Sequence, residues 1–355
     1  MNLYRKKEEC CGCGACAEQC PKGAINIIQD KEGFYYPRID KFICIECGQC
    51  GLVCPIKTTA RRSYDNLYIG AQARNKEIRY SSSSGGIFSI LAQYVLSRKG
   101  IVYGACFDGS MRVIHRGVED EYQLDQIKRT KYVQSDMQGI YDSIKKQLTN
   151  DRWVLFCGTP CQAQALMLFL NRIYERLIVV DLVCYGVPSP GIWETYVRYL
   201  EFKHRGKLTD FSFRDKRNRD NGQMRSYKIN GKEYVSFLYE DIYCRMYFKN
   251  YIIRPSCYSC KFCTVNRDSD FTIGDFWGIQ RYKPAFDDGM GTSLVIAHSE
   301  QAKKIWDEVK EEVFWFTCRR KDLLQPRLIN PTGFVKGRWG LMLLYKMLVF
   351  GLSVK

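Results

Sequence analysis

Cysteine is the residue type with the clearest chemical pattern in this chain of 355 residues, which contains 18 cysteines. Eight of them form two runs of C-x-x-C-x-x-C-x-x-x-C-P, within residues 10–21 and 44–55. This spacing is typical of bacterial ferredoxins, in which the fourth cysteine of each run serves the other 4Fe-4S cluster. The runs therefore predict two clusters, one on Cys10, Cys13, Cys16 and Cys54, and the other on Cys44, Cys47, Cys50 and Cys20.

Zinc is the alternative metal for clustered thiolates. Zinc sites take four ligands in separated pairs, and a third cysteine three residues farther on adds nothing to them. We therefore favour iron-sulfur clusters over zinc. Cys11 fits no position of either run, and we expect it to be a bystander.

Disulfides are a weak alternative for so many cysteines. A secreted chain needs a signal peptide, and the opening MNLYRKKEECC has a basic stretch with no apolar segment behind it. Reduced thiols and oxygen-sensitive clusters instead predict a cytoplasmic, reducing location. The apolar run at residues 341–350 is interrupted by Lys346 and falls short of the ~20 residues of a spanning helix, which argues against an integral membrane protein.

The net charge of +16 favours an acidic partner, an anionic ligand or an anionic surface. A nucleic-acid-binding module is the class that such a charge suggests first, but we find no basic helix, aromatic RNA-binding signature or zinc-finger spacing. We expect no nucleic-acid partner. The apolar and basic tail from Arg338 to Lys355 could make a weak membrane-surface contact, although core packing is the commoner use of such a segment.

The elements that position the remaining cysteines alternate between helix and strand from Gly85 onward. Two helix starts carry strong local signals, because Thr159-Pro160 and Ser189-Pro190 each combine an N-cap residue with proline at the first helical position. Helices are also expected over residues 87–100 and over 136–148 with Ser135 as its cap, and strands over 101–107, 153–158 and 177–184. This alternation predicts an α/β core with a substantially parallel sheet.

From about residue 207 the pattern changes to antiparallel pairing. An Asn230-Gly231 dipeptide between two alternating segments predicts a hairpin, and a further strand is expected over residues 271–276. The fold class is therefore α+β or α/β, with a small ferredoxin-like domain followed by a mixed core. The polar stretch over residues 57–66 is interpreted as a linker.

Several further motifs occur together in one order. They are SSSSGGIF (81–88), KYVQSD (131–136), GTPCQ (158–162), DLVCYGVPSP (181–190), FRDK (213–216), RPSCYSC (254–260) and SDFTIGDFWG (269–278). In these motifs the chain resembles the family of coenzyme F420 hydrogenase/dehydrogenase beta subunits, over essentially residues 8–300. It looks like the bacterial members associated with surface polysaccharide genes, with the ferredoxin unit fused at its N-terminal end.

The resemblance implies a flavin-binding core with FAD as cofactor. Serine hydroxyls and free N–H groups just before a helix suit a diphosphate, and the resembling family places its flavin at the matching segments. The residues expected at the flavin are Ser83, Ser84, Gly85, Gly86, Lys131, Tyr132, Gln134, Ser135 and Thr159. Asp275, Trp277 and Gly278 are expected to close over the flavin ring, but structural packing of Phe276 and Trp277 is at least as strong an alternative. No catalytic residue can be named.

The resemblance also implies a third cluster beside the flavin. Four cysteines supply the number of thiolates that such a cluster needs, and we choose Cys161, Cys184, Cys257 and Cys260. Cys157 and Cys263 are the spare candidates, since each stands three or four residues from a chosen ligand. Cys161 and Cys184 could instead be buried apolar cysteines. Tyr185 stands where members of the family commonly have His, which puts in doubt any proton transfer at that position.

The domains expected on this resemblance are 1–60 for the two-cluster ferredoxin, 61–155 for the first half of the core with the FAD phosphate site, 156–330 for its second half, and 331–355 for a helical tail. The function expected is an iron-sulfur flavoprotein oxidoreductase that moves electrons between 4Fe-4S clusters, FAD and a two-electron carrier. The alternative is an electron-transfer subunit or adaptor that docks an acidic ferredoxin or flavodoxin to a separate enzyme.

Overall fold

The N-terminal unit of the chain contains two short helices and one hairpin. The computed structural model describes residues 3–58, 65–216, 223–338 and 340. Helices α1 (Ala15–Glu18) and α2 (Gln49–Leu52) follow the first cysteines of the two runs, and β1 (Ile25–Gln29) pairs antiparallel with β2 (Tyr35–Ile39). Gly14 and Gly48 precede the two helices with φ of 80° and 76°, so the repeated sequence folds into a repeated loop.

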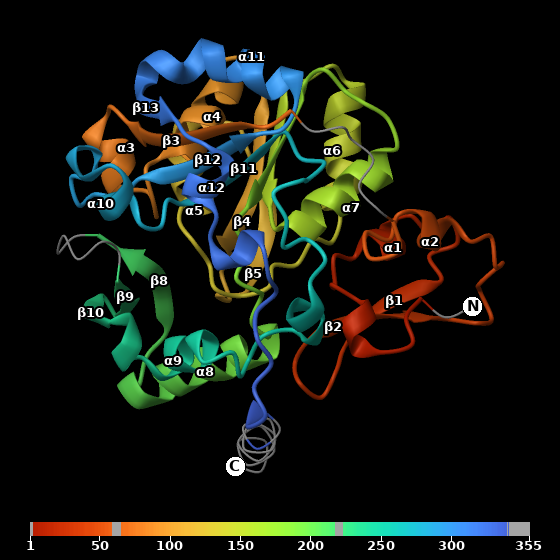
Figure 1. Ribbon diagram of the computed structural model, residues 1–355. Helices are drawn as coiled ribbons and strands as arrows, with labels where there is room; N and C mark the ends of the chain where they lie inside the picture. Colours follow the sequence, from red (N-terminus) through yellow and green to blue (C-terminus); the bar gives the residue numbers. More distant parts are fainter. Residues whose placement is uncertain (1–2, 59–64, 217–222, 339, 341–355) are drawn as a thin grey trace.

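A mixed sheet of eight strands forms the core (Figure 1), in the order β13-β3-β12-β11-β7-β6-β4-β5. The central neighbours β11, β7, β6 and β4 run parallel, while the outer pairs are antiparallel. The strands are β3 (Leu67–Ala73), β4 (Ile101–Phe107), β5 (Val113–Val118), β6 (Val154–Gly158), β7 (Leu177–Leu182), β11 (Phe271–Asp275), β12 (Ser293–Ala297) and β13 (Val313–Thr317).

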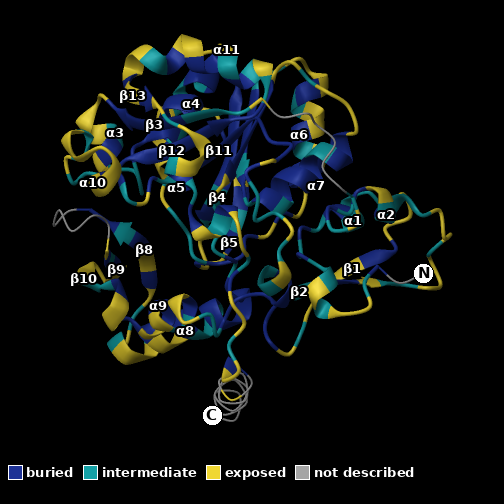
Figure 2. Cartoon of the chain, in the orientation of Figure 1, coloured by how far each residue is buried: buried dark blue, intermediate teal, exposed yellow. Residues whose placement is uncertain are grey.

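Helices cover both faces of this sheet, because its inner strands are apolar on both sides. Leu155 and Ile178 pack with α4 (Ile87–Leu96) and α11 (Glu300–Val309) on one face. Phe156 and Val179, the next residues along the same strands, pack with α6 (Ile140–Thr149) and α7 (Pro160–Leu170) on the other. The sheet is therefore buried, and the outer surface of α11 is exposed (Figure 2).

A smaller layer lies beside the carboxyl ends of the parallel strands. It contains the antiparallel sheet β10-β9-β8 and helices α8 (Pro190–His204) and α9 (Ile242–Phe248). The strands are β8 (Leu208–Asp215), β9 (Met224–Ile229) and β10 (Lys232–Phe237). Trp193 of α8 is fully buried among aromatic side chains of this layer. The remaining helices are α3 (Lys76–Tyr80), α5 (Glu121–Ile127), α10 (Ile279–Tyr282) and α12 (Arg320–Leu323).

Local sequence signals located most of these elements correctly. Pro160 and Pro190 open α7 and α8, the Ser189 hydroxyl accepts a bond from the N–H of Ile192, and Asn230-Gly231 forms the hairpin turn with φ of 51° and 74°. The mixed α/β fold class is confirmed. The core sheet is parallel only in its central part, since both of its edges are antiparallel.

The start of one helix was predicted wrongly. Helix α6 begins at Ile140 rather than at residue 136, and Ser135 does not cap it. Its free N–H groups are instead bound by Glu18 of α1, whose carboxylate accepts from the N–H of Gly139 at 2.8 Å and of Asp142 at 3.1 Å. The cap thus comes from a residue more than a hundred positions away, which no local signal in the sequence could show.

The proposed boundaries at residues 60, 155 and 330 stay predictions. The two proposed halves of the core share one sheet, because β3 pairs with β12 and β13. Much of the interpreted linker and nearly all of the apolar tail lie outside the described residues, in the stretches 59–64 and 341–355. Along the described ranges, no helix is long and apolar enough to cross a bilayer.

The buried side chain of Arg254 joins the N-terminal unit to the core. Its Nε donates to the carbonyl of Cys10 at 2.8 Å, and its Nη2 donates to the carbonyl of Tyr35 at 2.9 Å. Its Nη1 donates to Oε1 of Gln134 at 2.9 Å. Gly12 has φ of 69°, and a Cβ there would lie 2.6 Å from the guanidinium, so this contact requires glycine.

A second anchor lies at the tip of the β1–β2 hairpin. The carboxylate of Glu32 accepts two bonds from Arg338, at 3.0 and 2.6 Å, and the two side chains are 9% and 4% exposed. The Ser189 hydroxyl donates to the carbonyl of Glu32, and the N–H of Gly191 donates to the carbonyl of Gly33. Glu32 therefore connects the ferredoxin unit both to α8 and to Arg338, the first residue of the tail.

The substitution E32Q tests this anchor. It leaves the charge of Arg338 buried without its carboxylate, so we expect the free energy of unfolding to fall by about 3–5 kcal/mol. The measurement is urea unfolding of the anaerobically purified protein. The control E308Q removes one charge from the exposed Arg98–Glu308 pair and should cost about 0–1 kcal/mol. Equal losses in the two variants would contradict the assigned role of Glu32.

Candidate iron-sulfur centres and flavin-site residues

The first cavity lies between the two cysteine runs. Cys10, Cys13 and Cys16 line it together with Cys54 of the second run, as the ferredoxin pattern requires. Arg254 donates toward the Sγ of Cys10 at 3.7 Å, which places a cation beside a cysteine expected to ligate. The chain thus brings together the four cysteines expected to hold the first cluster.

The second cavity lies on the outer side of the same unit. Cys44, Cys47 and Cys50 line it together with Cys20 of the first run. The N–H of Ala24 donates to the Sγ of Cys20 at 3.3 Å, a contact that suits a thiolate. Cys50 lines both the first and the second cavity, so the two expected clusters are neighbours.

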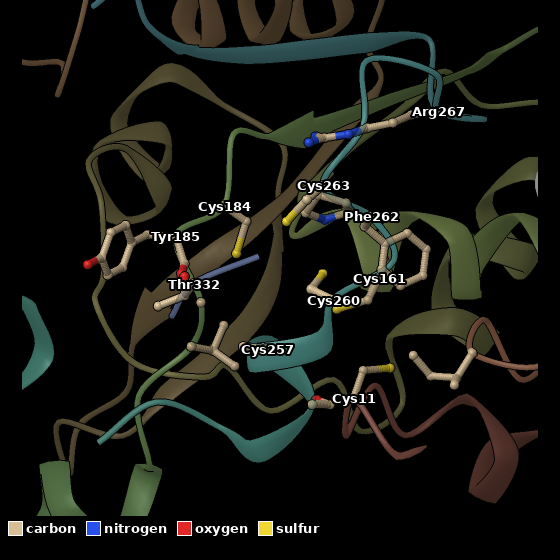
Figure 3. Close-up of a pocket in the computed structure, with 15 residues that line it drawn as sticks. Cys11, Cys161, Cys184, Tyr185, Cys257, Cys260, Phe262, Cys263, Arg267 and Thr332 are labelled. Atoms are coloured by element: carbon tan, nitrogen blue, oxygen red, sulfur yellow. The ribbon is translucent and has the colours of Figure 1, made fainter. Parts of the chain in front are cut away.

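The third cavity lies where the parallel strands end (Figure 3). Cys161 lies in the first turn of α7 after β6, and Cys184 follows β7. Cys257 and Cys260 come from the turn after α9, and all four line one cavity with Cys263. This is the edge at which open α/β sheets commonly bind ligands.

The spare candidates of the sequence separate here. Cys263 lies beside Cys260, while Cys157 is in strand β6, where its carbonyl is bonded to His115, and it does not line the cavity. Tyr185 lines the cavity, but its hydroxyl points away from the sulfurs (Figure 3) and donates to Oδ1 of Asn250 at 2.7 Å. It therefore offers no proton to this cavity.

The thiols of the third cavity suit ligands of the iron ions in an iron-sulfur cluster. Burial raises the pKa of Cys184 to about 12 and raises the pKa of Cys257 well above its usual range, so neither thiol ionises without a nearby cation. Iron supplies that charge and takes thiolate ligands. In the described part of the chain, no three His, Cys, Asp or Glu side chains are placed to hold a single metal ion.

Cys11 is the residue that sequence reasoning missed. It is 7% exposed and lines both the first and the third cavity, as does Ile56. Its side chain belongs to the buried cluster that contains Cys13 and against which Cys161 packs. No ligand spacing includes Cys11, so only the contact between distant segments reveals its position.

The expected diphosphate residues lie at the start of α4. Ser83 accepts bonds from the N–H and hydroxyl of Thr130, at 2.8 and 3.1 Å, while Ser84 donates to the carbonyl of Thr292. The N–H of Gly85 donates to Ser293, and Gly86 precedes the helix with φ of 90°. Among the described residues no side chain caps α4, so its first N–H groups can donate hydrogen bonds to an anion.

The other residues expected at the flavin have several different partners. Lys131 donates to the carbonyls of Gln126 and Arg129 at the end of α5, and its burial lowers its pKa to about 7. Gln134 donates to the carbonyls of Cys11 and Gly12, at 3.0 and 3.2 Å.

Ser135, Thr159 and Tyr132 complete the set. Ser135 and Thr159 both contact Gln162 of α7, and the Thr159 hydroxyl lies 3.2 Å from the Sγ of Cys161. Tyr132 packs on Tyr247 at 4.9 Å between ring centres. The structure therefore divides these residues between the start of α4, the aromatic layer and the cysteine cavities.

Lys216 is a second residue that the sequence left without a role, although it ends the FRDK motif. Its Nζ donates to the carbonyls of Ser84 and Met290, at 2.7 and 2.8 Å, and burial lowers its pKa to about 7. Arg214 of the same motif pairs with Asp275 at 2.7 Å. The motif thus brings cationic groups from β8 to the start of α4.

Comparisons with known proteins match two stretches of the chain. Residues 9–58 match the family described as 4Fe-4S dicluster domain. Residues 151–318 match the family described as the C terminus of the beta subunit of coenzyme F420 hydrogenase/dehydrogenase. The second stretch contains all four cysteines chosen for the third cavity, and the first contains the eight of the two runs.

Three individual proteins are similar to parts of this chain. A subunit of the F(420)H(2) dehydrogenase of Methanosarcina mazei is 24% identical over 190 residues, 49% of this chain and 53% of that protein, so the alignment spans about half of the relative. An uncharacterized ferredoxin of Methanocaldococcus jannaschii is 41% identical over 55 residues, 16% of this chain and 70% of the ferredoxin. A chain of the F420-reducing NiFe hydrogenase complex from Methanosarcina barkeri aligns with a TM-score of 0.46 and 16% identity, over 75% of this chain and 87% of that one.

The exchange of the fourth cysteines between the runs can be tested with serine variants. We expect C54S to lose the same EPR signal as C13S, and C20S to lose the same signal as C47S, each with about four iron atoms fewer per chain. The control C318S changes a cysteine outside the three cavities and should keep both signals. If C54S instead lost the signal that C47S loses, each run would hold its own cluster.

Proposed function

The chain belongs to the family of coenzyme F420 hydrogenase/dehydrogenase beta subunits and carries a 4Fe-4S dicluster domain at its N-terminal end, and from this premise we propose that it is an FAD-dependent iron-sulfur oxidoreductase with a third cluster. It would move electrons between the clusters, FAD and a two-electron carrier. Both matches were expected from the sequence motifs, and both are confirmed.

The observation that supports this function best is the succession of three cysteine cavities through the molecule. Cys50 lines the second and the first cavity, and Cys11 and Ile56 line the first and the third. Clusters held in this order would lead from the exposed Cys47 into the buried carboxyl edge of the core sheet. The proposed ligands are Cys10, Cys13, Cys16 and Cys54 for the first cluster, Cys44, Cys47, Cys50 and Cys20 for the second, and Cys161, Cys184, Cys257 and Cys260 for the third.

The residues at the start of α4 fit the diphosphate of FAD. Ser83, Ser84, Gly85 and Gly86 surround a helix end without a side-chain cap, where N–H groups and the helix dipole favour an anion. Lys216 lies against the carbonyl of Ser84 and adds a cation. Gln134 and Ser135 have partners elsewhere and are left out of the proposed flavin site.

When bound, the flavin would exchange single electrons with clusters and electron pairs with an organic acceptor. The chain itself contributes charge and position. Lys216 and Arg214 bring positive charge to the start of α4, and Asp275 holds Arg214 in place. Because Asp275 is occupied by this pair, it is not proposed to cover the flavin ring. Trp277 is 56% exposed, and we propose that it covers the ring when the flavin is present.

An electron-transfer role without a substrate site is the second candidate, supported by the surface around the second cavity. Phe42, Ile45 and Leu52 are 102%, 58% and 73% exposed on the ferredoxin unit, next to the exposed Cys47. The exposed Lys22 lines the second cavity, and the exposed Lys41 precedes Phe42. Apolar side chains among cations suit an acidic redox protein such as a ferredoxin or flavodoxin. We propose that such a partner exchanges electrons here, in a reducing cytoplasmic setting.

Iron and flavin content test the proposed cofactors. We expect about 12 iron atoms and one FAD per chain in protein purified without oxygen, since three 4Fe-4S clusters hold four iron atoms each. The variant C184S should fall to about 8 iron atoms and keep both signals of the ferredoxin unit. About 8 iron atoms without flavin in the unmodified protein would favour the electron-transfer role alone.

The flavin part of this prediction has its own variant. S83D places a negative charge at the start of α4, so it should lose FAD and keep its iron. The matched control S110D adds the same charge in an exposed turn and should keep both cofactors. Retention of FAD in S83D would place the diphosphate elsewhere.

The docking surface is tested by K41E. We expect reduction by an acidic ferredoxin or flavodoxin to slow several-fold at low salt and to approach the unmodified rate at high salt, because the change removes electrostatic steering. Reduction by dithionite should be unchanged. The control K304E alters an exposed lysine of α11, on the other side of the molecule (Figure 1). An equal slowing in K304E, or none in K41E, would exclude this surface.

A further inference from the structure

Two cavities proposed to hold clusters meet at the sulfur of Cys11. Cys11 lines both the first and the third cavity. Its side chain belongs to the buried cluster that contains Cys13, an expected ligand of the first cluster, and against which Cys161, an expected ligand of the third, packs. The labelled close-up shows Cys11 entering from the ferredoxin unit below the cysteines of the core (Figure 3). Cys11 therefore lies between the two proposed clusters.

The backbone around Cys11 is fixed by the core. Gln134 donates to the carbonyls of Cys11 and Gly12, while Arg254 donates to the carbonyl of Cys10. Tyr141 of α6 donates to the carbonyl of Cys13 at 2.8 Å. These four bonds come from three separate segments of the core. These bonds fix the backbone that carries Cys11, so its thiol is held between Cys13 and Cys161.

Cys11 is poorly placed to be a ligand of either cluster. The first cavity already has four cysteines with ferredoxin spacing, and the third has four cysteines besides Cys263. A thiol that is not a ligand keeps its proton and can donate it. Hydrogen bonds to ligating sulfurs withdraw negative charge from a cluster, which stabilises the reduced form and raises the reduction potential.

We propose that Cys11 is a positioning residue that donates a hydrogen bond to the ligating sulfur of Cys13 or Cys161, and so raises the reduction potential of the cluster that it faces. The proposal rests on the three-cluster arrangement of the proposed function. The Cys11 thiol has one proton and can donate it to only one of the two sulfurs at a time. The charge of the first cluster and the charge of the third therefore influence each other through this thiol. The second cluster has no contact with Cys11, since Cys11 does not line the second cavity.

The test is C11A, examined by potentiometric EPR on the full chain. We expect unchanged iron and a more negative potential for the signal that C13S or C184S removes. The potential of the second cluster, identified by its loss in C47S, should stay where it is. C11S keeps a donor and should restore most of the shift. The control C106A removes a fully buried thiol from β4 and should leave all potentials unchanged.

The other outcomes are distinct. A loss of about four iron atoms in C11A would make Cys11 a ligand and overturn its role as donor. Full iron with unchanged potentials would overturn the proposal as well. Finding only about 8 iron atoms in the unmodified protein would instead remove the third cluster and with it the proposed function. If the protein holds only two clusters, a shift of the first cluster's reduction potential in C11A would still support donation from Cys11 to Cys13.

Discussion

The arrangement of the molecule depends on one buried cation. Arg254 is fully buried, and its hydrogen bonds go to two carbonyls, one amide oxygen and the sulfur of Cys10. A buried charge is costly unless it is well paired. Neutral oxygens satisfy its hydrogen bonds but not its charge, and the negative charge of the cluster proposed on Cys10 would be its counterpart. On that proposal, docking of the ferredoxin unit and loading of its first cluster would be connected.

Fusion of the two units has a kinetic meaning. A separate ferredoxin must find its acceptor by diffusion, whereas a covalently joined one meets it at a high effective concentration. Here the joint is closed on several sides, because Arg254 of the core binds the ferredoxin unit, while Glu18 and Glu32 of that unit bind two other segments of the core. The ferredoxin unit is therefore a fixed part of the fold.

Local sequence patterns correctly predicted the features that depend on residues close together in the chain. Ferredoxin spacing located the eight cysteines around two cavities, and the Thr-Pro and Ser-Pro pairs located the starts of α7 and α8. The four core cysteines were chosen with the help of the family resemblance, and they share one cavity. Contacts between distant segments were out of reach. The cap of α6 by Glu18, the turn of Gln134 toward Cys11 and the place of Cys11 itself depend on how the units dock.

The close fit at Gly12 lets one position of the first loop decide how the two units are joined. The guanidinium of Arg254 lies where a side chain at Gly12 would stand. A residue with a Cβ at this position would push the guanidinium away from the carbonyls of Cys10 and Tyr35 and from Gln134. The absence of one carbon atom therefore keeps the ferredoxin unit seated on the core.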